Sequence, residues 1–151
     1  MKRALMAGAG ILALMSAGEA MAQDAPFSEV VVFGDSLSDT GNVATLQNLP
    51  TPNSYTTNPG PVTVEVVAEN YGLSTTASLL GGTNSAYGGA GYVNNAFGTP
   101  AGIPTLAAQV NARLAGGARI DPDALVILFG GGNDVNFAGT SLVIGSMTQA
   151  E

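Results

Sequence analysis

The stretch Val30-Val31-Val32-Phe33-Gly34-Asp35-Ser36-Leu37-Ser38-Asp39-Thr40-Gly41-Asn42 decides how the rest of the chain is interpreted. Its first four residues are continuously apolar, which predicts a strand buried on both faces, as in parallel sheets. Ser36 stands where this apolar run stops. A serine at such a junction is either a turn former, because its hydroxyl bonds nearby backbone groups, or a nucleophile at the carboxyl end of a parallel strand.

A second apolar run, Ala124–Phe129, ends in Gly130-Gly131-Gly132-Asn133-Asp134. Between the two runs, a helix is predicted from Pro104, with apolar residues every four positions and Gly116-Gly117 at its end. The repeating apolar residues are Leu106, Val110 and Leu114. A strand, a helix and a strand in this order predict a βαβ unit, and therefore a parallel sheet with right-handed crossovers.

The segments around this unit are less regular. Residues 37–48 could hold a short helix, and residues 49–61 contain three prolines before Pro61 and are predicted to be loop. Residues 62–71 fit either a strand or a helix, and Gly72 as a helix stop favours the helix. Residues 73–80 form a short strand or a connection. Residues 140–151 could begin another helix, which the chain end would interrupt.

Residues 81–102 are rich in glycine. Such a segment is either a flexible loop of low complexity or a loop whose backbone approaches a ligand closely or adopts positive φ. Tyr87 and Tyr92 lie in it, where they either flank a substrate pocket or serve packing.

The first 22 residues have the three parts of a secretory signal peptide: Lys2 and Arg3, an apolar run from Ala4 to Ala17, and the small-residue site Ala20-Met21-Ala22. The apolar run is shorter than the roughly 20 residues that a membrane-spanning helix needs. We therefore expect an exported protein that is secreted, periplasmic or displayed on an outer membrane. Residues 23–151 would then form the mature part.

Composition excludes several classes of function. After residue 22 the chain has two arginines against ten acidic residues, a net charge of −8, which disfavours nucleic-acid binding. The chain contains no cysteine, so disulfides cannot hold it. It also contains no histidine, so neither a histidine base nor a histidine-ligated metal can be built from these residues.

Polar residues follow both predicted strands, and the carboxyl ends of parallel strands meet at one edge of a sheet. Acyl transfer from an ester needs a nucleophilic hydroxyl and hydrogen-bond donors aimed at the oxygen that becomes negative. Ser36 could supply the hydroxyl. Its own N–H, a glycine N–H and the side-chain amide of Asn133 could supply the donors.

Three blocks in this order resemble the SGNH hydrolases, also called GDSL-type esterases and lipases. Residues 34–42 (GDSLSDTGN) resemble the family's nucleophile block, residues 82–90 (GTNSAYGGA) its second block, and residues 131–134 (GGND) its third. Residues 58–65 also resemble a stretch of the larger members. The resemblance implies a three-layer α/β/α sandwich with a parallel sheet, of flavodoxin-like type, which is incomplete at the C-terminus of residues 23–151.

Carried over by position, the resemblance makes Ser36 the nucleophile. The oxyanion hole would consist of the Ser36 N–H, a glycine N–H and the Asn133 amide. Gly89 is the expected glycine donor, with Gly88 as the alternative. Asp35 and Asp134 would be structural and would bond loop backbone. No metal or organic cofactor is implied, and the expected substrate is a small-molecule or lipid ester.

One departure from the family is serious, because its base comes from a late Asp-x-x-His block that this chain lacks. A serine hydroxyl without a base is a poor nucleophile. Two explanations stay open. The chain is the N-terminal fragment of an exported esterase and is inactive alone, or it is a catalytically degenerate secreted binding module that keeps the cleft. The sequence does not indicate the oligomeric state.

Overall fold

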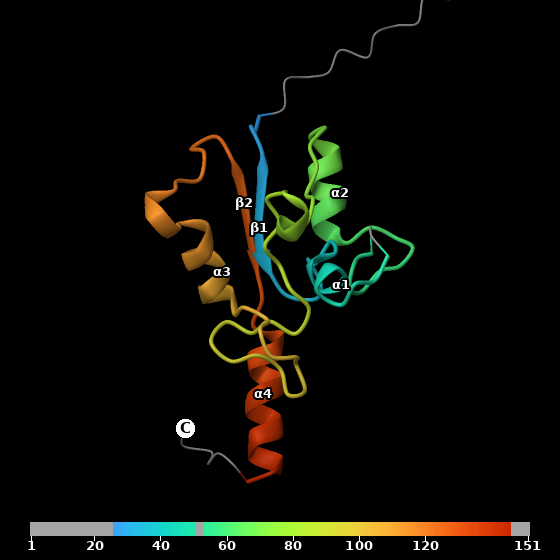
Figure 1. The fold of residues 1–151 in the computed structure, drawn as a ribbon, viewed down its shortest axis with the longest axis vertical. Helices are drawn as coiled ribbons and strands as arrows, with labels where there is room; N and C mark the ends of the chain where they lie inside the picture. Colours follow the sequence, from blue (N-terminus) through green and yellow to red (C-terminus); the bar gives the residue numbers. More distant parts are fainter. Residues whose placement is uncertain (1–25, 51–52, 146–151) are drawn as a thin grey trace, which may run out of the picture.

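A computed structural model of the protein describes residues 26–50 and 53–145. Two parallel strands, β1 (Val30–Gly34) and β2 (Leu125–Phe129), pair in register from one end to the other. Helix α3 (Leu106–Arg113) lies on one side of the strands and helix α2 (Thr63–Asn70) on the other (Figure 1). The α/β class with a parallel sheet, predicted from the sequence, is confirmed. The predicted signal peptide lies outside the described residues.

Strand β1 is the centre of the core. All five of its residues are buried, as its continuous apolarity predicted. Val30 and Val32 belong to a buried cluster with Val64 and Ala68 of α2. A second buried cluster lies beyond the carboxyl end of β1 and joins helix α1 (Asn42–Leu46), the glycine-rich loop and α3; its members are Val43, Tyr87, Ala90, Ile103 and Leu106.

Strand β2 departs from the prediction. Leu125 and Ile127 pack against the first cluster, whereas Val126, Leu128 and Phe129 are about half exposed, at 47, 55 and 51%. The prediction that both apolar runs are buried on both faces is therefore wrong for β2 within the described residues. Val126 and Leu128 share the face opposite Leu125 and Ile127, because alternate side chains of a strand point to opposite faces, and α3 on that side packs mainly against β1. Phe129 is the last residue of the strand.

The helices before the glycine-rich loop agree with the predictions made from the sequence. The predicted short helix in residues 37–48 is α1, and the helix favoured over a strand in residues 62–71 is α2. The first turn of α2 is stabilised because Glu65 Oε2 accepts the N–H of Val62 at 2.8 Å. Gly72 follows its end with a φ of 68°. Residues 73–80 contain a 3₁₀ turn, Ser78–Leu80, instead of a strand.

Helix α3 begins at Leu106, two residues later than Pro104, because the Thr105 hydroxyl caps it by accepting the N–H of Ala108 at 3.3 Å. Its buried face carries Leu106 and Gln109. Leu114, the last residue of the apolar repeat, lies beyond the helix and is 43% exposed. A 3₁₀ turn, Ala115–Gly117, follows at the predicted glycine stop.

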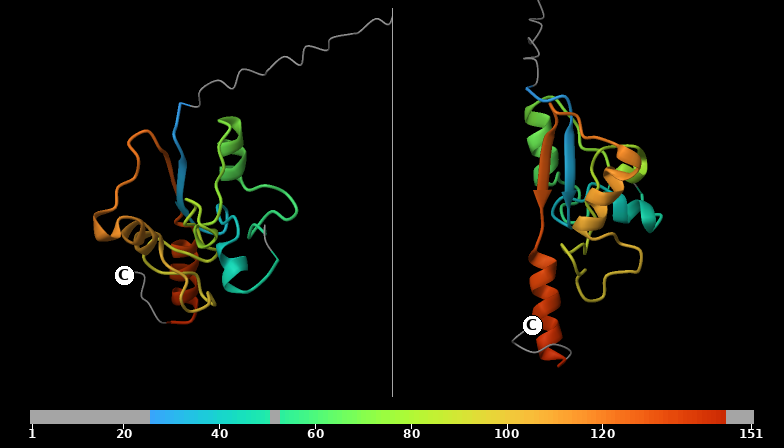
Figure 2. Two further views of the ribbon diagram at one scale, coloured as in Figure 1. Left: turned by 45° about the horizontal axis from the view of Figure 1, so that its top comes forward. Right: turned by 90° about the vertical axis from the view of Figure 1, so that its left-hand side faces the viewer.

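Helix α4 (Gly132–Val143) was predicted to begin near Thr140, and that prediction is wrong. The helix starts directly after β2 because Gly131 adopts a φ of 107°, which turns the chain at once. It extends away from the carboxyl ends of the strands (Figures 1 and 2). Within residues 26–50 and 53–145, none of the helices is long and apolar enough to cross a membrane.

Candidate active site

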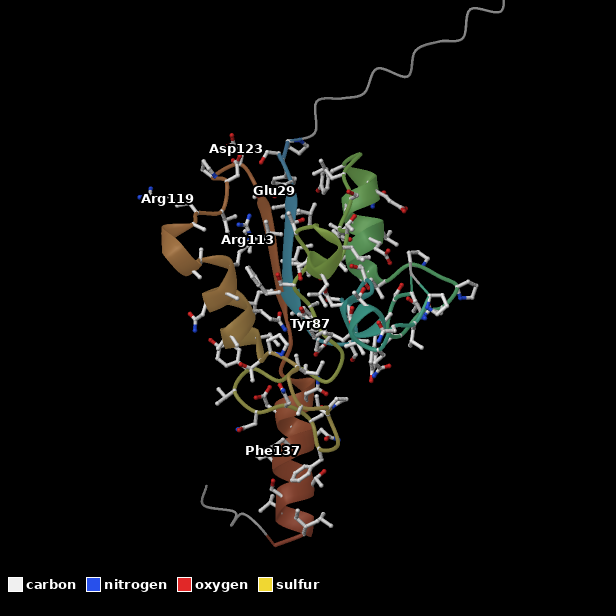
Figure 3. The ribbon with its side chains drawn as sticks, viewed as in Figure 1. Glu29, Tyr87, Arg113, Arg119, Asp123 and Phe137 are labelled. Atoms are coloured by element: carbon white, nitrogen blue, oxygen red, sulfur yellow. The ribbon has the colours of Figure 1, made fainter. Side chains whose placement is uncertain are left out.

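The candidate site lies at the carboxyl ends of β1 and β2, where the chain makes one turn after each strand. Ser36 follows β1 by two residues, and Asn133 stands in the first turn of α4. The glycine-rich loop passes the same edge, because the Tyr87 N–H donates to the Gly34 carbonyl at 3.1 Å. Figure 3 shows Tyr87 beside the carboxyl end of β1. All three blocks therefore meet at one edge of the sheet, as parallel strands require.

The nucleophile turn is held by the side chain and the carbonyl of Asp35 and by one loop contact. Asp35 Oδ1 accepts the N–H of Leu37 at 3.0 Å, and the Asp35 carbonyl accepts the N–H of Ser38 at 3.0 Å. The Thr56 hydroxyl donates to the Ser36 carbonyl at 3.1 Å. Burial raises the pKa of Asp35 above its ordinary value and outweighs the backbone hydrogen bonds that lower it. The half-buried Ser36 is thus presented on a tied turn.

Asp39 is fully buried and ties the nucleophile turn to the second block. Its Oδ1 accepts the N–H groups of Gly41 and Asn42 at 2.8 and 2.7 Å. Its Oδ2 accepts those of Val43 at 3.2 Å and Gly88 at 2.9 Å. Four backbone donors satisfy a carboxylate that would otherwise be costly to bury. The last of these bonds fixes Gly88 against the nucleophile turn.

Two buried asparagines connect the nucleophile block and the second block by hydrogen bonds. The Asn42 amide donates to the carbonyls of Asn84 and Ala86, both at 2.8 Å, and the Asn84 amide donates to the Ser38 carbonyl at 2.8 Å. Both side chains are 0% exposed. Since buried polar groups are costly unless paired, these bonds fix the relative position of the turn and the glycine-rich loop.

The two candidate glycine donors differ in what their N–H groups do. The Gly88 N–H is engaged by Asp39, whereas the Gly89 N–H bonds no group among the described residues. Gly89 has a φ of 84°, and a Cβ there would lie 2.5 Å from the Thr99 hydroxyl. A Cβ on Gly88 would lie 2.3 Å from the Tyr55 ring. Gly89 therefore requires glycine, whereas a side chain at Gly88 would require the half-exposed Tyr55 ring to move.

The third block is joined to the loop by Asn133 and Asp134. Asn133 Nδ2 donates to the Ala90 carbonyl at 2.7 Å, which uses one of its two amide hydrogens. The Asp134 carboxylate accepts the N–H groups of Tyr92, Val93 and Asn94 at 2.6, 3.1 and 3.4 Å. Although burial acts to raise the pKa of Asp134, these three hydrogen bonds outweigh it and lower the pKa.

Comparison with protein families gives one match. Residues 30–149 match the family model described as GDSL-like lipase/acylhydrolase, which covers most of the chain. The chain belongs to the GDSL-like lipase/acylhydrolase family. The resemblance found in the three sequence blocks is therefore confirmed. Among curated proteins, no similar sequence was found.

In this GDSL-like chain, Tyr87 and Tyr92 have different surroundings. Tyr87 is buried in the second cluster, and burial is the main reason why the pKa of its hydroxyl is raised. Tyr92 is 54% exposed beside Asp134. Phe97 of the loop stacks on Phe137 of α4, with ring centroids 5.1 Å apart, and Figure 3 shows Phe137 on that helix. The loop is thus fastened to α4 by polar and aromatic contacts.

An apolar cavity of about 260 Å³ opens beside the nucleophile turn. Its wall includes Leu37 of the turn, Val64 and Val67 of α2, and Ile127 and Phe129 of β2. For a metal, the described part of the chain offers no group of three or more acidic, histidine or cysteine ligands.

Sequence reasoning assigned no role to four residues that organise this site. Asp39 and Asn42 stand in the nucleophile block and Asn84 in the second block, so the blocks themselves contained the signal. Gln109 lies far from any block, yet it is buried and bonds Gly34. Its only sequence signal is a polar residue three positions after Leu106, on the face that the apolar repeat predicts to be buried.

Proposed function

We propose that the GDSL-like domain to which this chain belongs hydrolyses carboxylic esters through an acyl-enzyme on Ser36. The observation that supports it best is a pair of hydrogen bonds. Asp39 holds Gly88, the neighbour of Gly89, and Asn133 holds Ala90, its other neighbour. Gly89 is thereby fixed from both sides between the nucleophile turn and α4, with its N–H uncommitted among the described residues.

In the proposed reaction, Ser36 Oγ attacks the carbonyl carbon of the ester and the carbonyl oxygen becomes negative. The N–H groups of Ser36 and Gly89 and the second amide hydrogen of Asn133 stabilise that oxygen. A base takes the proton of the Ser36 hydroxyl and gives it to the departing alcohol. Water then attacks the acyl-enzyme, and the proton that it loses returns to Ser36.

The base is the part that these residues do not contain, since the chain has no histidine. We propose that a histidine outside the 151 residues supplies it, and that residues 23–151 alone have little or no esterase activity. Asp35 and Asp134 would support the two loops without touching substrate, which their bonds to backbone N–H groups favour.

The substrate would be a small-molecule or lipid ester, and the apolar cavity beside Leu37 supports an ester with a hydrophobic group. Export through residues 1–22 is part of the same proposal, because the sequence there has the three parts of a signal peptide.

The test measures hydrolysis of p-nitrophenyl acetate and butyrate by the product of the complete open reading frame and by residues 23–151. Ser36→Ala should abolish turnover, with a loss of at least about 10⁴-fold. Ser28→Ala, at the exposed entrance to β1, is the matched control and should leave the rate unchanged. Undiminished activity in Ser36→Ala would refute the nucleophile. Absence of hydrolysis by the complete product would favour a degenerate binding module.

A further inference from the structure

Gln109 is a buried amide that contacts β1 immediately before the nucleophile turn. It lies on the strand-facing side of α3 and is 2% exposed. Its Oε1 accepts the N–H of Gly34 at 2.9 Å, and its Nε2 donates to the Gly34 carbonyl at 2.9 Å and to the Pro104 carbonyl at 3.2 Å. One side chain therefore engages both backbone groups of Gly34.

The glycine-rich loop follows the free edge of β1 as an incomplete parallel strand. The Val32 N–H donates to the Thr83 carbonyl at 3.2 Å, and the Ser85 N–H donates to the Val32 carbonyl at 2.8 Å. The Tyr87 N–H continues this ladder to the Gly34 carbonyl at 3.1 Å. In a regular parallel ladder, a bond from the Gly34 N–H to the Ser85 carbonyl would lie between the last two of these.

Gln109 takes the place of that bond. Its Oε1 occupies the acceptor position that the Ser85 carbonyl would fill in a regular ladder. The replacement lies two residues before Ser36 on one chain segment and, at Tyr87, two residues before Gly89 on the other. The side chain therefore stands in for one strand-to-loop bond just before the two segments lead to the nucleophile and to the glycine donor.

We propose that Gln109 is a positioning residue that sets the separation between Ser36 and the Gly89 N–H; this inference rests on the proposed esterase function. Without its amide, the buried Gly34 N–H loses its acceptor and the ladder closes onto Ser85, which draws the loop toward β1. Gly34 itself is closely surrounded, since a Cβ there would lie 3.0 Å from the Phe129 carbonyl oxygen and from the Ser38 side chain.

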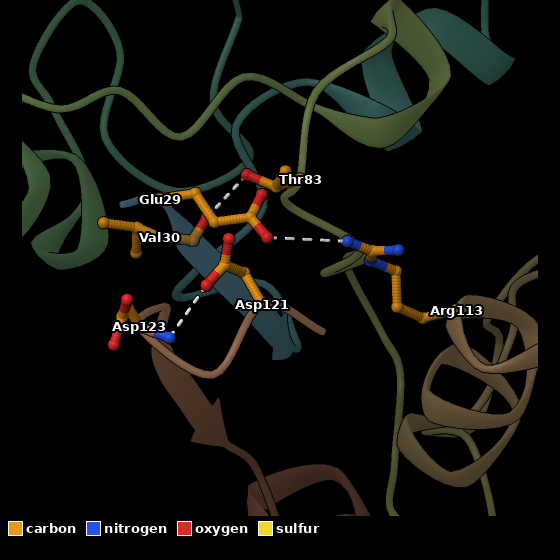
Figure 4. A network of polar contacts seen from close by, with 6 residues as sticks. All are labelled: Glu29, Val30, Thr83, Arg113, Asp121 and Asp123. Atoms are coloured by element: carbon orange, nitrogen blue, oxygen red, sulfur yellow. Dashed lines mark hydrogen bonds and ion pairs between the residues drawn. The ribbon is translucent and has the colours of Figure 1, made fainter. Parts of the chain in front are cut away.

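A second contact of α3 provides a matched control. One helical turn after Gln109, Arg113 pairs with Glu29 at 3.6 Å near the start of β1 (Figure 4). Both side chains are more than a quarter exposed, so the pair contributes little to stability. Glu29→Gln therefore removes a contact between α3 and the entrance of β1 at little cost and leaves the hydrogen bonds of Gly34 untouched. Asn111→Asp adds a charge to the exposed face of the same helix.

The test compares Gln109→Leu and Gln109→Glu with both controls in the product of the complete open reading frame. Gln109→Leu should lower kcat by about 10²-fold at all pH values with little change in KM, because the donor is displaced while substrate binding persists. In Gln109→Glu, the ionised carboxylate accepts the Gly34 N–H but cannot donate to two carbonyls. The activity of Gln109→Glu relative to the unsubstituted protein should therefore rise as pH falls from about 8 to about 5. The controls should stay within about twofold.

Amide NMR on the product of the complete open reading frame separates failure of this inference from failure of the proposed function. Gln109→Leu should shift the Gly34 amide resonance, because its acceptor changes from the Gln109 side chain to the Ser85 carbonyl, and should shift the Gly89 amide resonance as the loop moves. Glu29→Gln should do neither. These results would support the positioning role even if the complete product hydrolyses no ester. An unmoved Gly89 resonance, or a loss of kcat no larger than in Glu29→Gln, would overturn it.

Discussion

The two strands of the sheet have similar apolar sequences and different surroundings. Strand β1 is buried along its whole length, and the residues that follow it are held by three buried polar side chains, Asp39, Asn42 and Asn84. Strand β2 is half exposed, and the residues after it are held by Asn133 and by the partly buried Asp134. The nucleophile side of the candidate site is therefore preorganised within the described residues, whereas the α4 side depends on fewer contacts.

The largest effect is expected where the buried polar network of the nucleophile side is broken. Asp39→Asn replaces one accepting carboxylate oxygen with an NH₂ donor. That donor would face the N–H groups of Val43 and Gly88, which are donors themselves. Unfolding by urea should show a loss of about 4 kcal/mol or more. Glu69→Gln, at an exposed position of α2, is the control. A loss below about 1 kcal/mol for Asp39→Asn would show that the network is dispensable.

The α4 side should matter more for rate than for stability. Asn133→Ala removes an oxyanion donor and one partly buried hydrogen bond, so kcat should fall by about 10² to 10³-fold. The melting temperature should change little. Asn136→Ala, on the exposed face of α4, is the matched control in the same ester assay. An unchanged kcat in Asn133→Ala would remove this residue from the oxyanion site.

The strands themselves provide a third comparison. Val32→Ala removes methyl groups from a fully buried position and should cost about 2–3 kcal/mol in the free energy of unfolding. Val126→Ala, in the chemically similar β2, is 47% exposed and should cost about 0.5 kcal/mol. Equal losses in urea unfolding would show that β2 is as buried as its sequence predicted.

The two aspartates beside the site should respond to pH in opposite directions. The raised pKa of Asp35 means that its contribution to stability falls as pH rises through that pKa. The lowered pKa of Asp134 means that its contribution is present above the ordinary pKa of an aspartate and is lost as pH falls through the lowered value.

Melting temperatures of two variants between about pH 3 and pH 6 measure this difference. Relative to the unsubstituted protein, Asp35→Asn should become more stable as pH rises, and Asp134→Asn should become less stable. The expected shifts are small, and the opposite signs are the result that matters. Shifts of the same sign would contradict the assignment of burial to one residue and of backbone hydrogen bonds to the other.

The sequence predicted well those features that depend on local pattern. The continuous apolarity of β1 and the glycine after α2 are examples, because burial and helix ends leave marks within a few residues. The prediction of where α4 begins was wrong. Residues 130–134 are typical of a turn, and the helix starts at once because Gly131 adopts a positive φ.

The motifs indicated the candidate site and the backbone contacts of Asp35 and Asp134, but they did not indicate the other side chains that hold it. Ser36, Gly89 and Asn133 stand in blocks whose residues are close in sequence, so a pattern can identify them. The Gln109 amide bonds Gly34 across 75 positions, and nothing near either residue indicates that contact. The exposure of β2 likewise depends on which elements cover it, which its own apolar sequence does not determine.

The central claim is that Ser36 forms a covalent intermediate. The most direct measurement treats the product of the complete open reading frame with a fluorophosphonate ester, which phosphonylates an activated serine as fluoride leaves, and locates the adduct by peptide mass spectrometry. We expect one adduct, on the peptide containing Ser36, and none in Ser36→Ala over the same short exposure. An adduct on another residue, or ester hydrolysis that continues with Ser36 unmodified, would contradict the account.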